Sequence, residues 1–209
     1  MKHLIAAAKD AVAEGGSVPG SKAKFWRRVK EFNACVPYSG VQSNTEVPEV
    51  ALMALLSLFP APPNLPPEAP PPPPPSPKAS ATIIGLASCL RRLLSSTSAF
   101  SVVISNPTAV QRILGLLRSG SEGVAAEGAS LIAVLIGGGL GENGYVLNTK
   151  GERHAALMHA KSVLFNQEFY ITILVNRLKS VSVSPLLSMA VVEVLEAMLC
   201  EPQSENTDH

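Results

Sequence analysis

The chain has 209 residues, of which 46% are apolar, 16% are charged and only 5% are aromatic. This composition is too apolar for an intrinsically disordered chain, and it offers few of the alternating β-branched and aromatic runs expected of sheets. The formal net charge of +1 provides no bulk attraction for nucleic acid.

The N-terminal part of the chain predicts three helices. The first two cover Met1–Ala13 and about Ser21–Phe32, with glycine and proline pairs between them. Apolar residues of the second helix recur at helical spacing and therefore share one face. The third covers the nearly all-apolar run Glu49–Phe59, with Pro48 at a position that an early helical turn tolerates.

Pro60–Pro77 is the clearest boundary in the sequence, because twelve of its eighteen residues are proline. Proline fixes φ and lacks the amide hydrogen, so this segment predicts polyproline II helix, which rises about 3.1 Å per residue. Two interpretations stay open. The segment is either a stiff spacer or a docking site for a proline-recognition domain of the SH3, WW or EVH1 type.

The pattern after the linker is more strongly helical. Asn106 and Ser184 each precede a proline, the order expected of an N-cap followed by proline in the first turn. Val124–Ile136 is apolar apart from two residues, which predicts burial on most sides. The predicted helices are Lys78–Ser95, Pro107 to about Arg118, Val124–Ile136, Glu152–Asn166, Glu168–Lys179 and Pro185 to about Cys200.

The stretch from Ile113 to Ile136 resembles the core of an armadillo repeat. A helix end, a turn at Gly120 and a second helix with small residues in its first half follow one another, which lets two helices pack closely. A weaker copy begins near Ile173, offset by 61 residues. We therefore expect an all-α fold of armadillo/HEAT-like helical repeats. Two good copies are too few for an independent solenoid, which predicts exposed apolar surface, self-association or marginal stability.

Armadillo proteins that bind extended peptides carry a ladder of Trp and Asn on the inner helix. An ungapped alignment places Ser130 and Val134, then Val191 and Leu195, at those positions. This difference argues against a peptide groove. An independent armadillo-like adaptor for peptides or proline-recognition domains is kept as the alternative interpretation.

The sequence predicts no catalytic, cofactor-binding or metal-binding residues. Its two aspartates, Asp10 and Asp208, lie near the termini, which argues against Ser–His–Asp and Asp-dependent phosphoryl-transfer chemistry. His154 and His159 are five residues apart and do not share a helix face well. The G-x-G-x-x-G match at residues 139–144 follows a predicted helix rather than the strand that a dinucleotide site requires.

The three cysteines, Cys35, Cys89 and Cys200, are widely spaced and form no CxxC pair. Their number and spacing fit buried thiols of a reducing compartment better than a disulfide framework.

A basic cluster on the predicted second helix is the candidate surface site. It consists of Lys22, Lys24, Arg27, Arg28 and Lys30. A basic helix with an apolar face lies on anionic lipid or binds an acidic partner, whereas the alternative is an ordinary solvated face whose apolar side lies in the core. The uncharged runs are too short or too interrupted to span a bilayer, so any membrane contact is expected to be peripheral.

Several collinear segments closely resemble the plant form of the receptor-mediated-endocytosis-eight family of DnaJ proteins. The resemblance covers about Thr45–Pro202 and is specific because it is long, not because of one motif. The segments that carry it are Thr45–Phe59, Asn64–Ala79, Leu114–Gly139, Lys161–Lys179 and Ser182–Pro202.

The resemblance implies a role within a very large protein. Members of this family are peripheral endosomal proteins with helical repeats around a J domain, which recruits Hsp70 and stimulates its ATPase. Cytoplasmic location on endosome membranes, endosomal sorting partners, endosome organisation, endocytic sorting and transport to the vacuole are therefore expected. A J domain needs a His-Pro-Asp loop, and none of the four histidines here precedes a proline. The chain is thus expected to be a non-catalytic scaffold, with Hsp70 reached only through a J domain outside it.

The predicted organisation has four parts. Residues 1–59 form an N-terminal helical segment, 60–77 a proline-rich linker, 78–201 the armadillo-like repeat segment and 202–209 a disordered tail.

Overall fold

The computed structural model describes residues 3–4, 6–7, 10, 21–37, 40–42, 44–62, 69–137, 152–165, 168–179 and 184–199. All regular secondary structure within these ranges is helical, which confirms the predicted all-α class. The helices are α2 (Ser21–Cys35), α3 (Glu49–Ser57), α4 (Pro77–Leu93), α5 (Thr97–Ile104), α6 (Pro107–Leu116), α7 (Glu122–Leu135), α8 (Glu152–Phe165), α9 (Glu168–Lys179) and α10 (Pro185–Leu199). The predicted helix Met1–Ala13 lies largely outside the described residues.

The helix starts follow the expected chemistry. Asn106 caps α6, since its side chain accepts a hydrogen bond from the Ala109 amide at 3.0 Å, with proline in the first turn. Ser184 does the same for α10 through the Leu187 amide at 3.3 Å. Both capped starts were predicted from the sequence and are confirmed.

Helix α5 was not predicted. Thr97, Val102, Val103 and Ile104 are β-branched, and such residues lower helix propensity. Burial of Phe100, Val103 and Ile104 stabilises the helix instead. Packing therefore overrides local preference here.

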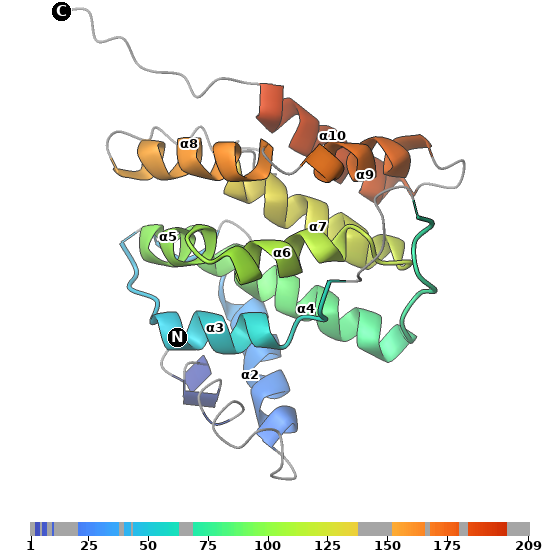
Figure 1. The fold of residues 1–209 in the computed structure, drawn as a ribbon. Coiled ribbons are helices and arrows are strands. Elements are labelled where there is room, and N and C mark those ends of the chain that lie inside the picture. The colour runs from blue at the N-terminus through green and yellow to red at the C-terminus, as the bar shows by residue number, and fades with distance from the viewer. Residues whose placement is uncertain are drawn as a thin grey trace, which may run out of the picture.

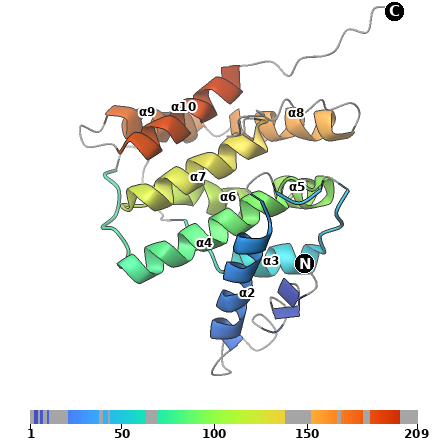
Figure 2. The same ribbon diagram turned by 180° about the vertical axis from the view of Figure 1, so that it is seen from behind.

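The helices form a stack with two layers. Helices α2, α4, α7 and α10 lie next to one another in that order along one layer, which faces the viewer in Figure 2. Helices α3, α5, α6, α8 and α9 lie along the other, most clearly seen in Figure 1. Because α4 and α2 continue the row begun by α10 and α7, the helical-repeat arrangement extends beyond the two copies seen in the sequence.

The close approach of α6 and α7 confirms the expected role of small residues in α7. A Cβ atom added to Gly128 would lie 2.7 Å from Leu116 Cβ and 3.1 Å from the Leu117 amide nitrogen. Neighbouring Ala125 and Ala129 are fully buried. Any larger side chain at Gly128 would force α6 and α7 apart.

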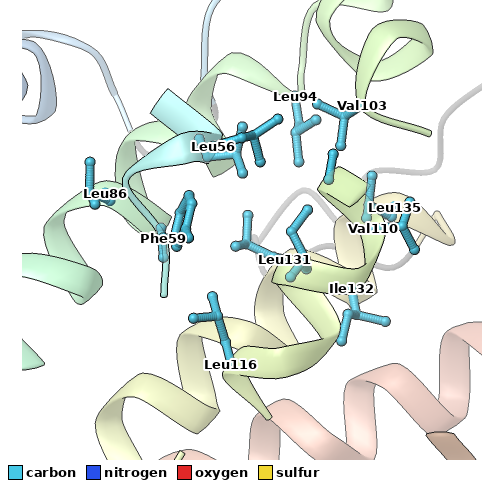
Figure 3. Close-up of a cluster of buried hydrophobic side chains, with 14 of the residues drawn as sticks. Leu56, Phe59, Leu86, Leu94, Val103, Val110, Leu116, Leu131, Ile132 and Leu135 are labelled. Atoms are coloured by element: carbon cyan, nitrogen blue, oxygen red, sulfur yellow. The ribbon is translucent and has the colours of Figure 1, made fainter. Parts of the chain in front are cut away.

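The apolar core is continuous across both layers. Phe25 of α2, Leu52 of α3 and Leu131 of α7 belong to the same cluster of buried side chains. Figure 3 shows its centre, where side chains from α3 to α7 converge. The division of the chain into an N-terminal segment, linker, repeat segment and tail stays a prediction.

Arginine side chains tie several helix C-termini to later helices. Exposed carbonyls at a helix C-terminus lack intrahelical partners and carry partial negative charge, so a guanidinium group stabilises them. Arg92 donates to Val36 O after α2, Arg112 donates to Leu56 O, Ser57 O and Phe59 O at the end of α3, and Arg177 donates to Leu117 O and Ser119 O after α6. These bonds connect residues more than fifty positions apart and were not predicted.

The connection between α2 and α3 is fixed against the end of α4. Gly40 has φ of +93°, and a Cβ atom there would lie 2.6 Å from Arg92 O. The Val41 amide donates to Arg92 O, and Ser95 Oγ donates to Val41 O. Only glycine combines this backbone conformation with this close approach.

Candidate functional site

The predicted basic cluster lies on helix α2. Lys24, Arg27 and Lys30 are exposed and Arg28 is half-buried, while the side chain of Lys22 lies outside the described residues. The structure therefore places the described members of the cluster on one surface helix at the end of the stack (Figure 2).

The apolar face of α2 is occupied by the fold. Phe25, Val29 and Phe32 are buried, and each residue is at most 6% exposed. The Asn33 side-chain amide donates to Gly85 O of α4 at 2.9 Å, which fixes α2 against α4. An α2 helix packed in this way cannot insert its apolar face into a lipid surface.

Acidic neighbours accompany the basic residues of α2. Lys24 Nζ lies 3.7 Å from Asp10 Oδ2, and Arg27 Nε lies 3.7 Å from Glu31 Oε1. Arg28 Nη1 donates a hydrogen bond to Glu31 Oε2 at 2.6 Å. Such exposed pairs contribute little to stability, but they lower the local positive potential. The geometry favours the interpretation of a solvated basic face, and its binding to lipid or an acidic partner stays a prediction.

The two cysteines that the structure describes do not share one environment, and Cys200 lies outside the described residues. Cys89 of α4 is fully buried, and burial raises the pKa of its thiol to about 12. Cys35, at the last turn of α2, is exposed, so the expectation of a buried thiol is wrong there. It is wrong because Cys35 lies outside the buried face of α2, which Phe25, Val29 and Phe32 form.

The predicted absence of a metal or nucleotide site rests on the sequence. Residues 139–144, which match G-x-G-x-x-G, lie outside the described residues, as does the side chain of His154. His159 is exposed on α8. In the part of the chain that the structure describes, no three His, Cys, Asp or Glu side chains are grouped for metal binding.

Charged side chains meet where α4, α7 and α10 pack together. Arg91 of α4 is only 6% exposed, and its charge acts on Glu127 of α7 and Glu193 of α10. Burial raises the pKa of both carboxyl groups, and Arg91 opposes that rise in each case. The signal in the sequence was Glu127, an acidic residue in the middle of a largely apolar helix. We assign this group a role in helix packing, because α7 is covered there by α4 and α10.

The positions that would form a peptide-binding ladder are covered. Ser130 is buried and Val134 is half-buried on α7, while Val191 is buried and Leu195 is half-buried on α10. Helix α10 packs directly along α7 in the same layer. The structure thus gives no support to a peptide groove on these helices.

The outer side of α10 carries the clearest exposed apolar surface among the described residues. Its buried residues, Leu187, Ala190, Val191, Val194 and Ala197, face α7. The opposite side, which we call the α10 outer face, consists of Leu186, Met189, Val192 and Leu199, exposed by 62%, 59%, 52% and 85%. In Figure 1 this helix is at the edge of the stack. The uncovered apolar surface predicted for a short repeat array is therefore present.

None of the described helices has the length and apolar character needed to cross a lipid bilayer.

Comparison with known proteins gives one informative relative. Over its whole length the chain is 65% identical to the DnaJ homolog subfamily C GRV2 of Arabidopsis thaliana. The chain is a close relative of one segment of that DnaJ protein. The resemblance seen in the sequence is thereby confirmed, and the matched segment spans 8% of the length of the Arabidopsis protein. No family model matches the chain. No solved structure matches it either.

Proposed function

We propose that the chain is a non-catalytic scaffold and interaction segment of a large DnaJ-type co-chaperone that acts on endosomes. Endosome organisation, endocytic sorting and transport to the vacuole are the processes it serves. Its identity of 65% to a segment of a DnaJ homolog supports the family context. The observation that carries the scaffold role is the α10 outer face at the edge of a helical-repeat stack.

The α10 outer face fits a further helical surface of the same large protein. Stacked repeats bury such faces against the next helix, and an end helix without a neighbour leaves its apolar residues in water. The matched segment is 8% of the Arabidopsis protein, which leaves a long polypeptide outside this segment to supply that neighbour. Full burial of one Leu, Met or Val side chain contributes about 1.5–3 kcal/mol, so even a few such contacts would hold two segments together.

Partners reach this segment by protein contact rather than through chemistry at a catalytic centre. The sequence carries no His-Pro-Asp loop, so recruitment of Hsp70 requires a J domain elsewhere in the larger protein. Endosomal sorting proteins are the proposed partners of the assembled scaffold. Its proposed location is the cytoplasmic side of the endosome, with peripheral attachment.

The scaffold role of the α10 outer face can be tested in the full-length Arabidopsis relative. The residues of the Arabidopsis relative that align with Leu186, Met189 and Val192 are changed to Ser, and delivery of a vacuolar reporter is measured. We expect the triple variant to lose delivery while its J domain still stimulates Hsp70 ATPase. Glu196→Ser, on the same side of α10, is the matched control and should leave delivery intact. Normal delivery by the triple variant, at equal protein level, would contradict the proposal.

The isolated chain offers a second test of the non-catalytic role. Purified chain should neither hydrolyse ATP nor raise the ATPase rate of a cognate Hsp70. Stimulation of the Hsp70 ATPase comparable to that given by an authentic J domain would contradict this assignment.

A further inference from the structure

In the proline run before α4, every third residue is half-buried and the residues between are exposed. Ala69, Pro72 and Pro75 are half-buried, whereas Pro70, Pro71, Pro73 and Pro74 are exposed. Polyproline II helix has three residues per turn, so residues three apart form one ridge along its length. The burial pattern shows that one ridge faces the protein body and the other two face solvent.

The inward ridge is anchored at the turn between α6 and α7. A Cβ atom on Gly120 would collide with Pro72 O and would lie 2.8 Å from Pro74 N, so only glycine lets the proline backbone approach this closely. Figure 1 shows the extended segment passing along the edge of the stack beside the start of α7 and on to α4. The body thus holds the middle of the proline run in place.

The C-terminal end of the run is fixed by the start of α4. Ser76 caps this helix, because its Oγ accepts a hydrogen bond from the Ala79 amide at 3.3 Å, and Pro77 occupies the first turn. Ser80 Oγ donates to Pro75 O at 3.4 Å. With its middle and one end held, the segment has little conformational freedom left to lose on binding.

We propose that Pro70–Pro75 is a docking site for a proline-recognition domain with an aromatic-lined groove, and that the fold presents its two outer ridges ready for binding. Such domains dock preformed polyproline II segments into grooves lined by aromatic rings. A groove that takes the ridge of Pro70 and Pro73 together with that of Pro71 and Pro74 does not disturb the inward ridge. The inference deepens the proposed interaction role by naming the class of partner.

The composition of the segment restricts that partner further. Ala69–Pro77 contains no charged residue and no aromatic residue. A domain whose affinity depends on a basic or aromatic side chain within the proline run finds no such group here. The fitting partner is one that reads oligoproline rings alone through stacked aromatic side chains.

Profilin, a small protein with an aromatic oligoproline groove, is a suitable probe. Its binding to the full 209-residue chain is measured by isothermal titration calorimetry, because the chain has a tryptophan of its own, Trp26, that would interfere with a fluorescence titration. We expect saturable binding that weakens by about tenfold or more when the outer ridges are changed by Pro70→Ala, Pro71→Ala, Pro73→Ala and Pro74→Ala together. The matched control, Pro72→Ala with Pro75→Ala, alters only the inward ridge and should change the Kd by no more than about threefold. Circular dichroism confirms that both variants keep their helices.

The Gly120→Ala variant tests whether the native fold presents the proline run for binding or hides it. The added Cβ would push the proline backbone off the α6–α7 turn. A displayed segment keeps its affinity or loses part of it, because an ordered ligand becomes less ordered. Binding that strengthens about tenfold in Gly120→Ala would show that the native fold hides the prolines, and would overturn the proposal.

The remaining outcomes are equally decisive. Absence of binding to the native chain, or equal loss in the outer-ridge and inward-ridge variants, would also overturn the docking site. None of these results affects the α10 test of the scaffold role, because the two surfaces lie on different elements.

Discussion

Helices α7 and α10 have similar sequences but different surroundings. Both are long, apolar on most sides and built with small residues where they pack together. Leu131 of α7 is fully buried, as Figure 3 shows at the centre of the core, whereas Leu186 of α10 is 62% exposed. Helix α7 has neighbours in both directions along its layer, and α10 has a described neighbour on one side only. The comparison teaches that an apolar helix is buried only as far as the fold supplies helices to cover it.

The largest expected effect comes from one substitution made in both helices. Leu131→Ala should lower the free energy of unfolding by about 2–5 kcal/mol, because it removes buried methyl groups and leaves a cavity. Leu186→Ala should change it by no more than about 0.5 kcal/mol, since that side chain is already in water. Urea unfolding followed by circular dichroism measures both. Equal losses would mean that α10 is covered in solution, by a second copy for example.

A smaller loss is expected where α9 fixes the turn that leads into α7. Arg177→Met removes the charged hydrogen bonds to Leu117 O and Ser119 O, and should cost about 2 kcal/mol. Lys179→Met, on the exposed end of the same helix, is the control and should cost no more than about 0.5 kcal/mol. If the two variants unfold at the same urea concentration, the arginine does not secure this turn.

The pH dependence of the free energy of unfolding gives a further comparison of α7 and α10, through the carboxyl groups of Glu127 and Glu193. Burial raises the pKa of Glu127 above 4.5, so the folded state binds its proton more tightly than the unfolded state does. The resulting stabilisation is present below about pH 4.5 and is lost as pH rises through the folded pKa. Glu127→Gln should therefore reduce the fall in unfolding free energy between pH 4.5 and 7. Glu193→Gln should reduce it less, because Glu193 on α10 is less deeply buried.

Unfolding at several pH values checks this pair of variants. A native chain whose stability rises steadily from pH 4.5 to 7, with the same slope in Glu127→Gln, would show that Glu127 does not titrate in this way.

The weakest expected effect concerns α2, whose apolar face is covered as that of α7 is. Without insertion, Lys24, Arg27, Arg28 and Lys30 offer electrostatic attraction alone, at about 1 kcal/mol for each residue near an anionic surface. We expect weak flotation with anionic vesicles, none with neutral vesicles, and loss of binding as the Debye length falls from about 10 Å at 0.1 M to about 3 Å at 1 M salt. Charge reversal by Lys24→Glu, Arg27→Glu and Arg28→Glu should abolish it. Equal binding of both proteins would leave recruitment by a partner as the better account.

Local signals explain which elements were predictable. The caps at Asn106 and Ser184 mark helix starts within a few residues, so α6 and α10 follow from the sequence. Helix α5 does not, because its β-branched residues disfavour a helix locally, and burial of its apolar side chains stabilises it together with the Ser96 cap. The exposure of Cys35 was also not predictable, since spacing alone does not show which side of α2 meets α4.

The candidate surfaces were likewise predictable only in part. The proline run and the basic cluster can be recognised from composition, but composition does not show whether the fold leaves them free to bind a partner. Packing of Phe25, Val29 and Phe32 against the core removes lipid insertion, whereas anchoring of Pro72 beside Gly120 leaves two proline ridges exposed. The Arg177 contact was missed because its partners lie about sixty residues earlier in the chain.

The sequence by itself determined the described helices other than α5, the polyproline segment, the family resemblance and the lack of a His-Pro-Asp loop, because each depends on neighbouring residues or on a long collinear match. Only the tertiary structure decided which apolar faces are covered, which prolines point outward and which arginines stabilise distant helix ends. Those properties depend on contacts between segments far apart in the chain, and the pattern within one segment carries no record of its neighbours.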